Sequence, residues 1–299
     1  MAEISTLSKD IATVLKNADT VEVPDEKIVA LAVRMAEQVR GVFGRGERSP
    51  REPNKLYVSE LGTRCTRQLW YKLHFSGTGE EVSPAAKVKF LYGNLLEELV
   101  LFLADLSGHE VKDQQKPVKW TFPKEVTKSG KEIVITGRRD ATIDGCVVDV
   151  KSASPYSYDK IVNTGLNVDN DDFGYREQVS GYVSTADELS NPIGILAIDK
   201  QNGHIGFKET EFISPSTALP RIEEALDSTT APERGYEAEP QGESGNMKLG
   251  MSCSYCAYKH DCWSNANHGK GLRTFIYGGK PVFLTKVVRE PRVAEVTRV

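Results

Sequence analysis

Residues 133–151, IVITGRRDATIDGCVVDVK, decide the fold. Two strand-like runs, 133–143 and 146–151, flank Asp144-Gly145, and this dipeptide is a strong signal for a two-residue hairpin turn. Side chains two residues apart on a strand point to the same face, so Asp149 and Lys151 project together. Because Asp140 lies on the partner strand, the hairpin carries two carboxylates and an ammonium group.

These three charges indicate a metal-dependent phosphodiester-cleaving site. Charges are costly to bury unless they bind something, and Mg²⁺ or Mn²⁺ prefers carboxylate oxygens. Such a metal polarises the scissile phosphate and lowers the pKa of an attacking water. Lys151 can orient or deprotonate that water if desolvation or the cation lowers its own pKa. Gln178 and Tyr182, four apart on an expected helix, can hydrogen-bond a phosphate or the lysine, although such a pair is more often ordinary helix surface.

The elements around the hairpin predict an α/β sandwich with a mixed central sheet. Apolar residues at helical spacing indicate a helix near residues 28–39 and a long helix over 84–106. The other expected elements are strands at 118–122, 193–199, 205–212 and 281–288, and helices at 175–189 and 214–226.

The long helix offers a third carboxylate, because Glu97 and Glu98 interrupt its apolar run. Leu91, Leu95 and Leu99 define the buried stripe of this helix, with Glu98 beside the stripe and Glu97 off it. Both can also lie on the solvated side, so spacing leaves the choice between them open.

Four cysteines form a second candidate site. Cys253, Cys256 and Cys262 make a C-x2-C-x5-C run, and Cys65 is the obvious fourth thiolate. Structural disulfides are rare in the cytosol, so this spacing points to zinc or to a [4Fe–4S] cluster. The bound metal or cluster would hold the two ends of the chain together and would not do redox chemistry. Cys146 stands alone in the hairpin and is expected to pack in the core.

The composition is that of an ordinary globular protein. Charged residues make up 27% of the 299 residues, and the net charge of −4 argues against a generally basic nucleic-acid coat but allows a local basic groove. No run is long enough to span a membrane, the N-terminus lacks signal-peptide features, and no Walker A motif is present. We therefore expect a cytoplasmic protein with no P-loop motor and no membrane partner.

Four ordered motifs resemble those of the PD-(D/E)XK nuclease superfamily, in its RecB-like branch: Gly93-x-x-x-Glu97, Gly137-x-x-Asp140, Asp149-x-Lys151 and Gln178-x-x-x-Tyr182. The resemblance implies a restriction-endonuclease-like core with Lys151 as the catalytic lysine. It implies a metal held by Glu97, Asp140, Asp149 and the main-chain carbonyl of Val150. A histidine that many RecB-like members carry is absent, and Asp149 stands where glutamate is commoner.

The cysteine pattern, one distant cysteine and a compact run of three, resembles the iron–sulfur nuclease domains of AddB and of CRISPR-associated RecB-like nucleases. Residues 57–71, around Cys65, are also similar to the start of those domains. The resemblance covers residues 57–263 and favours a [4Fe–4S] cluster over structural zinc. The expected parts are an N-terminal helical extension and linker (1–55), a nuclease domain with its cysteine cluster (56–263) and a basic C-terminal tail (264–299).

The expected function is a Mg²⁺- or Mn²⁺-dependent exonuclease on single-stranded DNA or duplex ends, in recombination, repair or phage DNA processing. A single-strand-annealing protein or a helicase would be its partner, in the bacterial cytoplasm or a phage-infected host cell. Arg64, Arg67 and Trp70 can guide a strand by charge and stacking, although core packing is the expected role of at least one of Trp70 and Tyr71. A CRISPR-adaptation trimming nuclease and a non-catalytic DNA-end-binding scaffold are the alternatives. The sequence leaves polarity, exo or endo action and oligomeric state open, a ring included.

Overall fold

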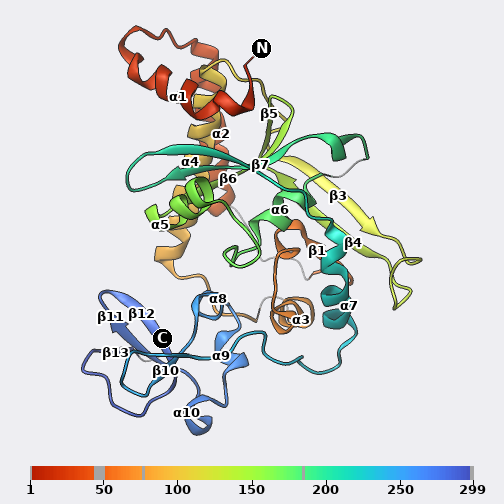
Figure 1. Cartoon of the computed structure of the whole chain (residues 1–299), viewed down its shortest axis with the longest axis vertical. Coiled ribbons are helices and arrows are strands. Elements are labelled where there is room, and N and C mark those ends of the chain that lie inside the picture. Colours follow the sequence, from red (N-terminus) through yellow and green to blue (C-terminus); the bar gives the residue numbers. More distant parts are fainter. Residues whose placement is uncertain (1, 44–50, 76–77, 184–185, 297–299) are drawn as a thin grey trace. The chain divides into compact units, whose positions relative to one another are not determined.

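The computed structural model describes residues 2–43, 51–75, 78–183 and 186–296. Residues 44–50, part of the expected linker, lie outside this description. The chain divides into two compact units, Met1–Gly62 with Val82–Leu219 (unit 1) and Thr63–Glu81 with Pro220–Val299 (unit 2). This division differs from the three expected segments, since the N-terminal helices belong to unit 1 and the expected tail to unit 2. The fold is mixed α/β, as predicted (Figure 1).

Unit 1 contains two mixed sheets. Its strands are Lys55–Tyr57 (β1), Val111–Lys112 (β2), Lys116–Phe122 (β3), Ile133–Arg139 (β4), Ala141–Ile143 (β5), Cys146–Ala153 (β6), Ile193–Asp199 (β7) and Ile205–Thr210 (β8). The larger sheet has the order β2-β5-β6-β7-β8, in which β6 and β7 are parallel and the other neighbours antiparallel. The smaller sheet has the order β1-β4-β3, with β1 parallel to β4.

The hairpin between β5 and β6 forms as predicted. Asp144 and Gly145 both have positive φ, 48° and 81°, as a type I′ turn requires. One difference lies upstream, where the expected strand 133–143 is broken at Asp140. The break sends β4 to the smaller sheet and β5 to the larger one, so Asp140 lies at the junction of the two sheets.

The helices of unit 1 pack against the larger sheet, except Asp25–Phe43, which packs on the long helix Pro84–Leu106. They are Leu7–Lys16 (α1), Asp25–Phe43 (α2), Pro84–Leu106 (α4), Pro155–Tyr158 (α5) and Tyr175–Gly181 (α6), with 3-10 or π turns at Ile4–Thr6 (η1), Ala18–Thr20 (η2), Val58–Glu60 (η3), Asp159–Thr164 (η4), Ala186–Ser190 (η5) and Pro215–Ala218 (η6). The bounds of α4 match the prediction, because Ser83 caps its first turn and Pro84 occupies the first helical position. Val100, Leu101 and Ala104 of α4 belong to one buried cluster with Val148 and Val150 of β6.

The α6 helix is shorter than the helix expected at 175–189. It ends at Gly181, whose carbonyl accepts a hydrogen bond from the indole N–H of Trp120 at 2.9 Å. Residues 184–185 lie outside the described range, and η5 follows them. The prediction of one long helix did not include this contact at the end of the helix, because Trp120 lies on β3, in another part of the chain.

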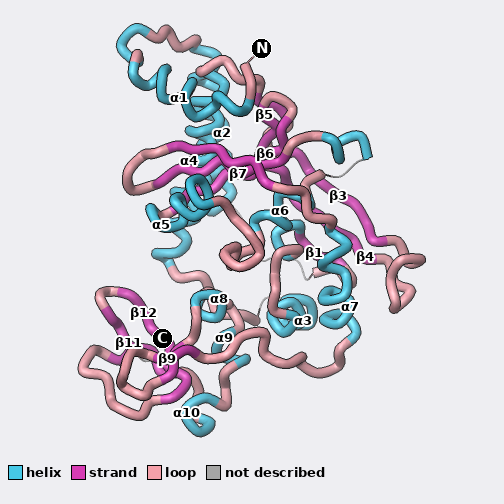
Figure 2. The backbone as a smooth tube through the Cα atoms, in the orientation of Figure 1, coloured by secondary structure: helices cyan, strands magenta, loops and turns pink. Residues whose placement is uncertain are grey.

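Unit 2 combines short helices with an antiparallel sheet, whose strands are magenta in Figure 2. Its helices are Thr66–His74 (α3), Leu219–Asp227 (α7, which begins at the unit boundary), Met251–Ser254 (α8), Lys259–Cys262 (α9) and Ala266–Gly269 (α10). The sheet has the order β13-β11-β12-β10-β9, formed by Glu239–Pro240 (β9), Met247–Lys248 (β10), Arg273–Tyr277 (β11), Lys280–Lys286 (β12) and Glu295–Val296 (β13). The sequence predicted only the β12 strand, so the expectation of an otherwise irregular tail was wrong.

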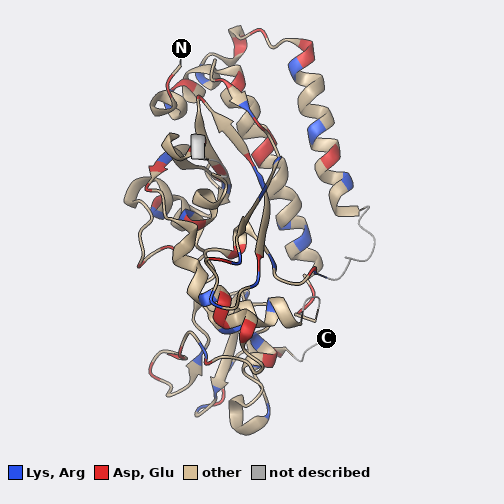
Figure 3. Cartoon of the chain, turned by 90° about the vertical axis from the view of Figure 1, so that its right-hand side faces the viewer, with Lys and Arg blue, Asp and Glu red and all other residues tan. Residues whose placement is uncertain are grey.

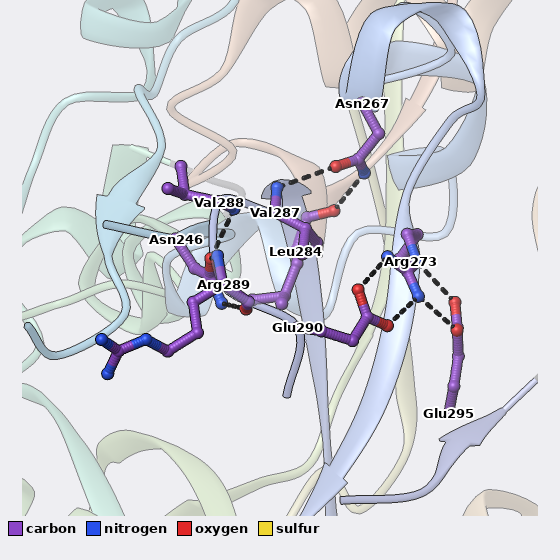
Figure 4. A network of polar contacts seen from close by, with 9 residues as sticks. All are labelled: Asn246, Asn267, Arg273, Leu284, Val287, Val288, Arg289, Glu290 and Glu295. Atoms are coloured by element: carbon purple, nitrogen blue, oxygen red, sulfur yellow. Dashed lines mark hydrogen bonds and ion pairs between the residues drawn. The ribbon is translucent and has the colours of Figure 1, made fainter. Parts of the chain in front are cut away.

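This C-terminal sheet is held by contacts between side chains that lie far apart in the sequence (Figure 4). Arg273 forms ion pairs with Glu290 at 2.5 Å and with Glu295 at 2.6 Å. The amide nitrogen of Asn267 donates to the carbonyl of Leu284 at 2.9 Å. Arg273, which counts toward the basic charge of the segment, is therefore engaged by two carboxylates.

Charge and hydropathy agree with the composition. Lys and Arg as well as Asp and Glu are spread over the helices and loops in Figure 3. Within the described ranges, no helix combines the length and the apolar character needed to cross a membrane.

A glycine contact holds η3 and α6 together, and it yields a test. A Cβ on Gly62 would lie 2.4 Å from backbone atoms of Gly174, so Gly62→Ala should lower the free energy of unfolding by about 3 kcal/mol, as severe overpacking does. The control is Gly203→Ala, where φ is +77° and a Cβ meets nothing within 4 Å. It should cost about 1 kcal/mol from left-handed strain alone. Denaturant unfolding measures both, and equal losses would contradict the contact.

Candidate active site and cysteine site

The charges on β6 face each other as the strand spacing predicts. Asp149 is fully buried, and its Oδ2 atom lies 2.7 Å from the Nζ atom of Lys151. This oxygen has no hydrogen bond of good geometry beside that ion pair. The Lys151 ammonium also lies 5.0 Å from the ring centroid of Tyr175, at the start of α6. The pair therefore forms a compact charged site on one face of the sheet.

Asp140 approaches β6 from the junction between β4 and β5. Its Oδ2 atom accepts a hydrogen bond from the main-chain N–H of Val150 at 2.8 Å. Strand pairing between Ala141 and Val148 places this carboxylate next to the Asp149 position. The structure thus brings together the two hairpin carboxylates that the sequence predicted.

Gln178 on α6 supports Asp149 and does not contact the lysine in the described structure. Its Nε2 atom donates to Asp149 Oδ1 at 3.2 Å and to the Tyr182 hydroxyl at 2.8 Å. The start of α6 is fixed by Asp171, whose carboxylate accepts the main-chain N–H groups of Tyr175 and Arg176, both at 3.0 Å. Of the predicted pair, Gln178 therefore contacts the site directly, at Asp149, and Tyr182 holds Gln178.

Adjacent glutamates on α4 have opposite surroundings. Glu98 is 3% exposed and accepts hydrogen bonds from Arg34 at 3.1 Å and Gln38 at 2.7 Å, both on α2. Glu97 instead accepts a hydrogen bond from Gln115 at 2.7 Å, and its carboxylate interacts electrostatically with Lys151. Glu98 is thus a helix-packing group, and Glu97 is the α4 carboxylate that belongs with the charges on β6.

The pKa of each of the three carboxylates is raised. Burial, then the neighbouring charge of Glu98, raises the pKa of Glu97 to about 7. Burial followed by the Asp149 charge raises the pKa of Asp140, and burial raises the pKa of Asp149. Burial alone would lower the pKa of Lys151, but Asp149 and Asp140 outweigh it and raise that pKa, opposite to the expected direction.

This donor set has the chemistry of a divalent-cation site. Repulsion between buried carboxylates is the condition that a hard cation relieves, and its binding would displace their protons. Within the described residues, no group of three or more His, Cys, Asp or Glu side chains is already arranged around one metal position. Each carboxylate instead has a partner within the protein: Gln115 for Glu97, the Val150 amide for Asp140 and Lys151 for Asp149.

The four predicted cysteines line one pocket in unit 2. Cys65, Cys253, Cys256 and Cys262 share this pocket with Tyr236, Trp263 and other side chains. Burial, then the other three thiols, raises the pKa of Cys253 to about 12. A Cβ on Gly235 would lie 3.2 Å from the Cys65 sulfur, so the chain passes close to this thiol.

Cys146 is fully buried in the core of unit 1, as predicted. Burial raises the pKa of its thiol to about 12. It therefore serves as a small apolar core residue, separate from the cysteine pocket.

The residues expected to guide DNA are engaged in packing unit 2. Trp70 is 8% exposed and donates its indole N–H to the Ser228 carbonyl at 2.8 Å, so its ring is not open for base stacking. Arg67 donates to the carbonyl of Pro232 at 2.7 Å and lines the cysteine pocket. Arg64 is half-buried, and its charge acts on Tyr236 beside that pocket. The core-packing alternative holds for Trp70.

Sequence reasoning missed several residues that build the site. Gln115 and Asp171 hold Glu97 and α6, and Tyr175 covers Lys151. Arg139 is 1% exposed and donates to the carbonyl of Tyr182 at 2.9 Å and to Glu188 at 2.8 Å. Among these residues only the burial of Arg139 had a local sequence signal. Arg139 lies two residues before the apolar Ala141, and residues two apart on a strand face the same side.

Comparison with known proteins gives matches to solved structures. No family model matches the chain, and no curated protein sequence matches it. Among solved structures, the crystal structure of SSO0001 aligns with a TM-score of 0.45 and 17% sequence identity, covering 76% of this chain and 93% of that chain.

The adjacent glutamates should respond differently to removal. Glu98→Ala should lower the free energy of unfolding by about 2 kcal/mol, because Arg34 and Gln38 lose a charged hydrogen-bond acceptor. The ion pair with Arg34 contributes only a small part of this loss, because Arg34 is partly exposed and solvent screens the pair. Glu97→Ala should leave stability within about 0.5 kcal/mol but abolish Mn²⁺ binding. Denaturant unfolding and titration calorimetry measure the two effects. Mn²⁺ binding that survives Glu97→Ala and fails in Glu98→Ala would reverse the assignment.

Proposed function

We propose that this chain is a metal-dependent DNA nuclease with a restriction-endonuclease-like core, acting as an exonuclease on DNA ends. The observation that carries the proposal is the buried group on β6, where Asp149 pairs with Lys151 at 2.7 Å beside Asp140. Glu97 completes it from α4. Buried charges grouped in this way are typical of catalytic sites, and the order of the motifs along the chain supports the nuclease reading.

Each residue then has a chemical role. Glu97, Asp140, Asp149 and the main-chain carbonyl of Val150 would hold Mg²⁺ or Mn²⁺. When bound, this cation would polarise the scissile phosphate and acidify a water. Lys151 supplies a donor that orients a water or a phosphate oxygen, and Asp149 fixes its position. Gln178 holds Asp149 through a hydrogen bond and is itself held by the Tyr182 hydroxyl.

We further propose that Cys65, Cys253, Cys256 and Cys262 hold a [4Fe–4S] cluster that stabilises unit 2. Burial and the charges of the other three thiols raise the pKa of Cys253, and a metal that replaces the thiol protons would relieve this repulsion. Zinc is the alternative occupant, but it draws four sulfurs to about 2.3 Å from a single point. The spacing of one distant cysteine and a compact run of three favours the cluster.

Cleavage should depend on the lysine and on the cation. We expect Lys151→Ala to slow cleavage of end-labelled DNA at least about 100-fold, as the loss of an electrostatic stabiliser does, and EDTA to abolish it. Lys112→Ala, at a lysine whose side chain is 63% exposed, is the matched control and should cleave normally. Assays with single- and double-stranded DNA in Mg²⁺ or Mn²⁺ also give the polarity. DNA binding without cleavage by the native protein would favour the end-binding scaffold.

The cysteine pocket gives a second test. Protein purified without oxygen should contain about four iron atoms per chain and absorb visible light, and Cys253→Ser should lose both. Because the energy of metal binding is folding energy, Cys253→Ser should also unfold unit 2 at a lower temperature. Cys146→Ala, which removes the cysteine outside the pocket, should keep the iron. Stoichiometric zinc in place of iron would assign the other metal.

A further inference from the structure

The smaller sheet of unit 1 presents a polar face formed by β1, β4 and β3. Strand register aligns Tyr57 with Thr136 and Thr136 with Lys119, so these three side chains share one face. Arg138 is two residues from Thr136 and therefore lies on the same face. Its neighbour Arg139 points the other way and is buried, whereas Arg138 is exposed.

A cavity of about 400 Å³ opens on this face next to the candidate active site. Tyr57, Ser59, Thr136, Arg138 and Tyr182 are among its lining residues. The link to the β6 charges is direct, because the Tyr182 hydroxyl bonds Gln178 and Gln178 bonds Asp149. The volume lies within the range of small-ligand sites.

Gly137 of β4 also lines the cavity and is closely packed. A Cβ there would lie 2.8 Å from a Val58 methyl carbon and 3.4 Å from the Tyr182 ring. No larger residue fits without moving η3 or Tyr182. The glycine thus lets Val58 and Tyr182, two lining residues of the cavity, pack directly against β4.

The lining combines a cation, an aromatic ring and hydroxyl groups. Across the described residues, Arg138 forms no ion pair or hydrogen bond, and no acidic side chain lines the cavity. Tyr57 is 47% exposed, and Arg51 lies 4.9 Å from its ring centroid. Ser59 and Thr136 add hydroxyl donors. A positive group that binds phosphate, next to an exposed ring on which a base stacks, is the combination that single-stranded nucleic acid requires.

We infer that this cavity binds the nucleotide next to the scissile phosphate of an unpaired DNA strand, with Tyr57 stacking on the base and Arg138 holding its phosphate. The inference rests on the proposed nuclease function and narrows its substrate. An unpaired strand is required because a duplex keeps its bases stacked on each other and out of reach of Tyr57. The substrate class at this position is thus a single strand or a frayed end.

The test measures binding in EDTA, where cleavage is absent. A fluorescent single-stranded oligonucleotide should bind Tyr57→Ala about 5- to 100-fold more weakly than the native protein, while Tyr57→Phe, which keeps the stacking ring, binds normally. Arg138→Ala should weaken binding and reduce the slope of log K against log salt concentration by about 1. Lys112→Glu, on β2 of the larger sheet, is the charge control and should change little.

Parallel cleavage assays separate the two ideas. Native cleavage, with normal single-strand binding by Tyr57→Ala and Arg138→Ala, would overturn the nucleotide site and leave the nuclease intact. Weaker binding by both variants without native cleavage would support the nucleotide site and count against the nuclease. Equal losses on blunt duplex DNA would overturn the assignment to an unpaired strand. Failure of the native protein to bind either DNA would overturn the nucleotide site, and the cleavage assay would then judge the nuclease alone.

Discussion

The buried ion pair between Asp149 and Lys151 is the constraint on which unit 1 depends. A carboxylate with no exposure to water costs several kcal/mol unless charges and hydrogen bonds compensate it. Lys151 provides the charge, and Gln178 provides a hydrogen bond from α6. Asp140 is held at the Val150 amide in the break between β4 and β5. Lys151 lies on the same strand as Asp149, whereas Gln178 comes from α6, so the burial of this carboxylate ties β6 to α6.

Close backbone contacts and one buried cation hold those elements in place. A Cβ on Gly181 would lie 2.4 Å from a Leu61 methyl carbon, so the end of α6 packs directly on the residues after η3. Arg139 ties β4 to the same region through the Tyr182 carbonyl and Glu188. Because Arg139 and Gln178 both act near Tyr182, the scaffold and the site share one anchor. A stiff support of this kind keeps the Asp149 carboxylate in a fixed position.

Local signals predicted the hairpin and α4, since a turn dipeptide and a cap act within a few residues. The role of Glu98 was not predictable, because its partners lie on α2, about 60 residues earlier in the chain. Two strands after Cys262, β11 and β13, were missed for a similar reason. Arg273 on β11 pairs with Glu290 and with Glu295 on β13, whereas by composition alone these residues resemble a charged tail. The sequence did predict that the four cysteines come together, because the spacing of thiol ligands is a chemical signal that does not depend on the fold of the chain between them.

The four residues from Gly137 to Asp140 carry four separate tasks because strand alternation divides them. Gly137 lets Val58 and Tyr182 pack against the strand, and Asp140 joins the charges on β6. The two arginines between them are chemically identical, yet one is buried and bonded while the other is exposed. Exchanging their surroundings would require a shift of one residue in the register of β4, which would also move Asp140 away from the Val150 amide. The register of this strand therefore couples the buried scaffold contacts of Arg139, the position of Asp140 and the inferred nucleotide site.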